Sequence, residues 1–117
     1  MGVVGNLHVE RGIAYKVEGN YTEAITELQA ALMEEPGCGE AHHQLGLIYG
    51  FTGLFDESLE ELQKALSLDT GNNVARNDLA LTYAMLGMNE EAKAEFDEVL
   101  RRDPENEVAR KNIVFFE

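Results

Sequence analysis

Apolar residues recur along the chain at helical spacing, in runs that are interrupted at regular intervals. Leu45, Ile48, Tyr49 and Thr52 are spaced by three and four residues, and the pattern then breaks at Gly53-Leu54. A second run ends at 69–71 and contains Leu59, Leu62, Ala65, Leu66 and Leu68. Spacing by three and four residues is typical of one face of an amphipathic helix. The pattern therefore predicts two helices of roughly 13 residues joined by a tight turn.

This two-helix pattern recurs with a period of 34 residues. Segments 5–38 and 39–72 are identical at 12 of 34 positions, and segments 39–72 and 73–106 at 10. Composition alone would give roughly two matches. The chain thus holds three copies of one unit, and 107–117 begins like the first helix of another. Because helices this short are marginal in water, the stacking of the units must supply the stability.

Each unit also carries large and small residues at fixed spacing. The second unit reads His42-x2-Leu45-Gly46-x2-Tyr49, then Ser58-x3-Leu62. The other two read His8-x2-Arg11-Gly12-x2-Tyr15, Ala24-x3-Leu28, Pro36, and Arg76-x2-Leu79-Ala80-x2-Tyr83, Ala92-x3-Phe96, Pro104. This pattern resembles the tetratricopeptide repeat (TPR) family over residues 5–106. The resemblance implies one all-α domain over 1–117, a right-handed α-solenoid of three antiparallel helix pairs with a capping helix at 107–117.

Two kinds of glycine are expected to have a structural role. Gly19, Gly53 and Gly87 come where each first helix ends, a place that favours a left-handed residue. The resemblance places Gly46 where the two helices of a repeat come closest, with Ala24, Ser58 and Ala92 as the small partners across the contact in the three copies. Gly50 is not required by the repeat, because Lys16 and Ala84 stand at the equivalent positions. Either Gly50 leaves room for a ligand or it is a tolerated weak point in the helix.

The charge of the chain is strongly negative and unevenly distributed. The net charge is −13, and the second helices (22–35, 56–69 and 90–103) hold 15 of the 22 acidic residues. In the TPR family the second helices form the convex back, and the first helices line a concave groove. Most of the acidity is therefore expected on a solvated back. A nucleic-acid partner is not expected, because binding phosphates requires clustered Lys and Arg.

The motifs of catalysis and membrane insertion are missing from the sequence. No Gly-rich phosphate loop, elbow serine or convincing metal-ligand spacing is present, so we expect neither an enzyme nor a cofactor. His42 and His43 are adjacent on a helix and point about 100° apart, so they do not readily share a metal ion. The longest apolar stretch, around 45–55, is shorter than the roughly 20 residues needed to cross a bilayer. With no secretory signal and a single cysteine, Cys38, we expect a cytoplasmic protein.

The resemblance also identifies the residues that would line the groove. They occupy the fifth, ninth and thirteenth positions of the three repeats: Val9, His43 and Asn77; Ile13, Leu47 and Leu81; Val17, Phe51 and Met85. The last two rows are apolar in every copy and would form an apolar strip, and exposed apolar patches usually mark binding sites. His43 and Asn77 would offer hydrogen bonds beside the strip. The alternative is that the tail or another subunit covers it.

These features predict a protein-interaction module that binds an apolar or amphipathic peptide or helix in its groove. Two other hypotheses stay open: a self-assembling homo-oligomeric scaffold, and a regulatory fragment of a larger enzyme. Some TPR proteins hold the C-terminal carboxylate of heat-shock chaperones with a clamp of Lys, Asn and Arg. The matching positions here are Val9, Ile13, Gln44, Val74 and Asp78. None of them is a cation, so this type of co-chaperone function is not expected.

Overall fold

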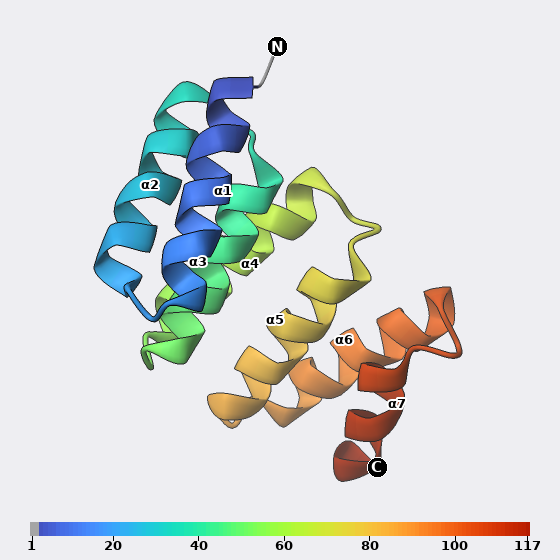
Figure 1. Ribbon diagram of the computed structural model, residues 1–117. Coiled ribbons are helices and arrows are strands. Elements are labelled where there is room, and N and C mark those ends of the chain that lie inside the picture. Colours follow the sequence, from blue (N-terminus) through green and yellow to red (C-terminus); the bar gives the residue numbers. More distant parts are fainter. Residues whose placement is uncertain (1–2) are drawn as a thin grey trace.

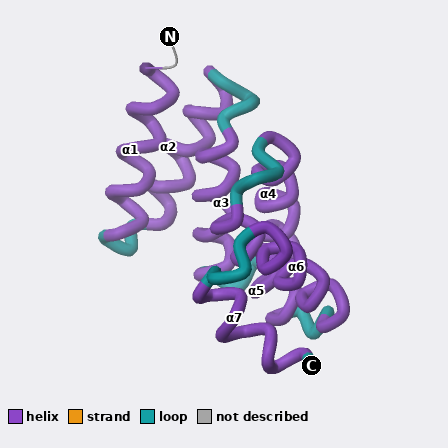
Figure 2. Tube along the Cα trace, turned by 90° about the vertical axis from the view of Figure 1, so that its right-hand side faces the viewer, coloured by secondary structure: helices purple, strands orange, loops and turns teal. Residues whose placement is uncertain are grey.

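The structure is a computed structural model that describes residues 3–117, with side chains from residue 7 onward. Every element in this range is helical (Figures 1 and 2). The elements are α1 (Val3–Val17), α2 (Tyr21–Glu34), α3 (Gly39–Phe51), α4 (Phe55–Leu68), α5 (Asn73–Met85), α6 (Asn89–Arg102), α7 (Glu107–Ile113) and the 3₁₀ helix η1 (Val114–Phe116). The all-α prediction is therefore confirmed.

The helices pack as antiparallel pairs that stack in sequence order. Within each pair, α1 packs against α2, α3 against α4, and α5 against α6. Each second helix then contacts the first helix of the next pair, and α1, α3 and α5 also contact one another in order. The described ends of the chain lie at opposite ends of the stack (Figure 1). The first helices thus form a continuous layer, which is the layer expected to carry the groove.

The turn inside each helix pair has the same geometry in all three copies. Gly19, Gly53 and Gly87 have φ angles of 81°, 81° and 76°, in the left-handed region. The backbone N–H that follows each glycine closes the preceding helix: Leu54 donates to the carbonyl of Tyr49 at 2.8 Å, and the other two turns repeat this bond. Glycine is needed here because a side chain disfavours this conformation. The prediction for these three glycines is confirmed.

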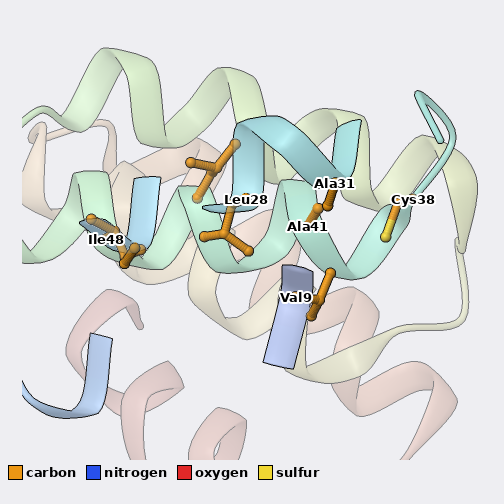
Figure 3. Packing of buried hydrophobic residues seen from close by; sticks show 8 residues of the cluster. Val9, Leu28, Ala31, Cys38, Ala41 and Ile48 are labelled. Carbon is orange, nitrogen blue, oxygen red and sulfur yellow. The ribbon is translucent and has the colours of Figure 1, made fainter. Parts of the chain in front are cut away.

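The hydrophobic core consists of three clusters, each built from neighbouring helix pairs. The first joins Val9, Leu28 and Ala31 to Cys38, Ala41 and Ile48 (Figure 3). The second joins α4 to α5 through Leu62, Leu66, Ala75 and Leu79. The third joins Ala80 of α5, Phe96 and Val99 of α6, and Ala109 of α7. Because each cluster spans a boundary between pairs, stacking removes from water the apolar surface that a single pair would expose.

The C-terminal helix is shorter than the 107–117 expected. The α-helix ends at Ile113, and the last turn tightens into the 3₁₀ helix η1, as often happens where the final carbonyls have no α-helical partner. Phe116 of η1 lies against Phe96 with ring centroids 5.9 Å apart. Ala109 is fully buried. Together, α7 and η1 cover the third core cluster.

The helices α3 and α4 approach each other closely at Gly46. A Cβ atom there would lie 2.7 Å from Cγ and 2.8 Å from Cδ2 of Leu62. The side chain nearest to this Cβ position is thus that of Leu62. Ser58, the small partner expected across the contact, also meets Gly46: its Oγ donates a hydrogen bond to the carbonyl oxygen of Gly46 at 2.7 Å. Glycine is therefore required at position 46 by the adjacent leucine.

Candidate peptide-binding groove

The apolar strip (Ile13, Leu47, Leu81, Val17, Phe51 and Met85) lies on the layer of first helices. Its outer row is strongly exposed, with Val17 at 79%, Phe51 at 59% and Met85 at 67%. In the inner row, Ile13 and Leu47 are half-buried, and Leu81 is 38% exposed. The ring of Phe51 lies against that of Tyr21, with centroids 6.2 Å apart. Aromatic pairs at this separation attract each other, so the contact favours this position of the Phe51 ring.

A hollow of about 230 Å³ opens in the strip between α3 and α5. Leu47, Phe51, Leu81 and Met85 line it, with Phe55, Ser58 and Leu62 of α4 below and Gly46, Gly50, Asp78 and Thr82 at the sides. The hollow exists partly because two glycines of α3 place no side chain in it. A Cβ on Gly50 would meet only Oγ of Ser58, at 3.5 Å, which is an ordinary contact. Packing therefore does not force a glycine at position 50, and its side of the hollow stays open.

The fifth-position residues are placed differently from the strip. Val9, His43 and Asn77 are exposed by only 6%, 6% and 5%. Val9 belongs to the first core cluster. Nε2 of His43 contacts Oδ2 of Asp78 at 2.7 Å, and Nδ2 of Asn77 donates to Oδ1 of Asn106 at 3.0 Å. These three residues lie buried at the contacts between successive repeats, so their side chains are not exposed to a peptide in the groove.

Sequence reasoning missed a ladder of hydrogen bonds between the two helices of every repeat, in which the Arg76–Glu95 contact is an ion pair. The residue at the fourth repeat position, where many TPRs have a large aromatic residue, pairs with a glutamate 19 residues later. The pairs are His8–Glu27 at 2.8 Å, His42–Glu61 at 2.6 Å and Arg76–Glu95 at 2.8 Å. His42 also contacts the carbonyl oxygen of Pro36 at 3.2 Å, and Arg76 donates to that of Thr70 at 3.0 Å. The signal was available, since the glutamates recur with the same period of 34.

Cations are scarce on the layer of first helices, and those near the strip have partners. Nζ of Lys16 donates to Oε1 of Gln44 at 2.5 Å, and Nε2 of Gln44 donates to Oε2 of Glu40 at 2.8 Å. The clamp positions Val74 and Asp78 carry no cation either. The electrostatic character of the groove centre is thus set by Asp78.

Within residues 3–117 the structure brings together no three His, Cys, Asp or Glu side chains that could hold a metal ion. The same residues include no helix with the length and hydropathy to span a bilayer.

Burial raises the pKa of the Tyr49 phenol, and the carboxylates of Glu61 and Glu57 raise it further. The hydroxyl of Tyr49 therefore keeps its proton at neutral pH.

Comparison with protein families identifies the class of this chain. Two family models described as tetratricopeptide repeat match residues 9–73 and 52–111. Each match covers more than half of the chain, and the chain belongs to the tetratricopeptide repeat family. Among curated proteins, none matches the sequence.

Solved structures share the fold at low sequence identity. The first TPR domain of Spaghetti (RPAP3) bound to the HSP90 peptide SRMEEVD is 21% identical, with a TM-score of 0.94 over 99% of this chain and 92% of that one. The second TPR domain of human RPAP3, in complex with the HSP70 peptide SGPTIEEVD, is 21% identical, with a TM-score of 0.87 over 96% and 97%. The TPR domain of Arabidopsis OM64 is 18% identical, with a TM-score of 0.88 over 94% and 91%. These likenesses establish a TPR solenoid.

Proposed function

We propose that this protein is an interaction module that binds an apolar or amphipathic peptide or helix on the apolar strip. The observation that carries the proposal is the hollow between α3 and α5, bordered by the exposed side chains of Phe51, Leu81 and Met85. TPR proteins are generally non-catalytic interaction modules. Exposed apolar side chains around a concave, mostly apolar hollow are the features of a ligand site.

The peptides bound by the similar structures point to a different ligand here. Both peptides end in the acidic sequence EEVD. At the positions that would hold a terminal carboxylate this chain has Val9, Ile13, Gln44, Val74 and Asp78, of which none is a cation and one is an acid. The ligand of this groove is therefore anchored by apolar side chains.

Selection from a random peptide library displayed on phage tests the proposal, with the purified protein immobilised. Peptides rich in large apolar residues should be enriched. Their affinity should fall at least tenfold on Phe51→Ala, because truncating a central aromatic anchor commonly costs about 2 kcal/mol or more of binding. Gly50→Leu should weaken the same peptides, because the new side chain fills the hollow while the nearest atom to its Cβ is 3.5 Å away.

Glu60→Lys is the matched control on the convex back. Glu60 is 69% exposed and pairs weakly with Lys64 at 3.4 Å, so its reversal should leave affinity nearly unchanged at physiological salt. Glu61 is unsuitable as a control because it contacts His42 in the ladder between the paired helices. If Glu60→Lys abolishes binding and Phe51→Ala does not, the site lies on the back. If light scattering shows the mass rising with concentration, and Phe51→Ala prevents the rise, a second copy occupies the strip.

A further inference from the structure

We propose that the ligand of the apolar strip carries a lysine or arginine beside its large apolar side chain, and that Asp78 binds this cation. The inference rests on the function proposed above and specifies the chemistry of the partner. The groove then binds basic amphipathic segments, which are opposite in charge to the acidic peptides bound by the similar structures.

The charge around the hollow is the first observation. Of the described residues that line it, Asp78 alone is charged, and the others are apolar, glycine or hydroxyl residues. The side chain of Asp78 is 22% exposed. An apolar ligand group that enters the hollow therefore comes to lie beside a carboxylate that is already partly buried.

The hydrogen bonding of Asp78 leaves one oxygen for a ligand. Oδ2 contacts Nε2 of His43 at 2.7 Å. Among the residues that the structure describes, no donor reaches Oδ1. An ionised carboxylate accepts up to about four hydrogen bonds. Asp78 thus has unused acceptor capacity on the surface that a ligand would cover.

Desolvation decides which ligand fits. An apolar group seated among Leu47, Phe51 and Leu81 displaces water from Asp78, and taking a carboxylate out of water is unfavourable unless it is paired. Because Oδ2 already contacts Nε2 of His43, a neutral apolar ligand leaves Oδ1 without a compensating partner, and an acidic ligand adds repulsion. A guanidinium or ammonium group next to the apolar anchor instead forms a charge-assisted hydrogen bond to Oδ1.

Among the described residues that line the hollow, none is Lys or Arg, and Lys16 of α1 donates to Gln44 at 2.5 Å. The net charge of −13 also favours a basic segment over an acidic one, although salt screens this contribution. Local pairing and the overall field thus favour the same sign of ligand charge.

Sequencing the peptides enriched in the phage selection tests whether the ligand carries a cation. On the wild-type protein, enriched peptides should carry Lys or Arg next to a large apolar residue. Replacing that cation by Gln in a synthetic copy of the best peptide should weaken binding to the wild type about tenfold, and to Asp78→Asn less than about twofold. Asp78→Asn keeps an acceptor for His43. Glu60→Gln on the back removes the same charge and should behave like the wild type.

The outcomes distinguish a failure of this inference from a failure of the proposed peptide-binding function. Two results would overturn the assignment of Asp78 without contradicting the binding groove. One is the enrichment of apolar peptides that lack a basic residue. The other is a Gln replacement that weakens binding equally to the wild type and to Asp78→Asn. Enrichment of acidic peptides overturns the assignment as well. If no peptide is enriched, or if binding is indifferent to Phe51→Ala, the groove itself is refuted.

Discussion

The two glycines of α3 should respond differently to the same substitution. In both Gly46→Ala and Gly50→Ala the helix gains about 1 kcal/mol of propensity. At position 50 the added methyl meets nothing closer than Oγ of Ser58 at 3.5 Å, so the gain should appear as increased stability. At position 46 the methyl would lie 2.7 Å from Cγ of Leu62, a side chain that is 1% exposed and cannot move into solvent.

Overpacking of this kind typically costs about 1–3 kcal/mol. Because the propensity gain is common to both variants, it cancels in their comparison, and the difference in unfolding free energy should be about 1–3 kcal/mol in favour of Gly50→Ala. For a chain of this size that corresponds to a gap of about 4–15 °C in Tm. Urea denaturation and thermal melting, both followed by circular dichroism at 222 nm, the usual helix signal, measure the two quantities.

The third repeat supplies a rescue variant. There Ala80 replaces the glycine and Phe96 replaces the leucine, and both residues are fully buried. Gly46→Ala combined with Leu62→Phe copies that pair into the second repeat and should recover part of the lost stability. If Gly46→Ala is as stable as Gly50→Ala, the close contact with Leu62 does not explain the glycine, and the reasoning fails.

Three further predictions concern the ladder, a turn and a surface carboxylate. Glu95→Gln should lower the free energy of unfolding, measured in urea, by about 1–3 kcal/mol, because it leaves Arg76 half-paired at a site where its side chain is 14% exposed. An unchanged urea midpoint would mean that this pair does not stabilise the fold. Gly53→Ala should cost about 1 kcal/mol, because φ is 81° although no atom lies within 4 Å, whereas Gly37→Ala, equally open and without a positive φ, should be neutral or stabilising. Hydrogen bonds from two arginines of α6 lower the pKa of Glu98 to about 2. Its stabilising contribution is therefore present above about pH 4.5 and lost as the pH falls through about 2, and an NMR titration that gives an ordinary value would contradict the pairing.

The local pattern of the chain was sufficient to predict its elements. Apolar spacing of three and four residues fixes a helix, and a glycine at its end fixes the turn, since both depend on interactions within a few residues. A motif repeated three times at one period then leaves little freedom in how the units stack. For the same reason the exposed row Val17, Phe51 and Met85 could be named in advance: its apolar character contrasts with the solvated position that the repeat gives it.

Pairings between repeats could not be read in the same way. His43 and Asp78 are 35 residues apart and meet only when α3 and α5 lie side by side. Asn77 is buried, and its amide donates to Asn106, the residue that precedes α7. The position of a residue within one helix predicts the direction of its side chain, but the packing of the neighbouring helix determines whether that side chain is exposed or buried.

The sequence by itself determined the helix pairs, their turns and the layer that carries the apolar strip. The tertiary structure decided which residues of that layer stay open, that Leu62 makes Gly46 obligatory, and that a hollow forms beside Asp78. The physical reason is the distance along the chain over which each kind of interaction acts. Backbone hydrogen bonds and apolar periodicity act over a few neighbours in the chain, whereas burial and ion pairing depend on distances that exist only after the repeats have stacked.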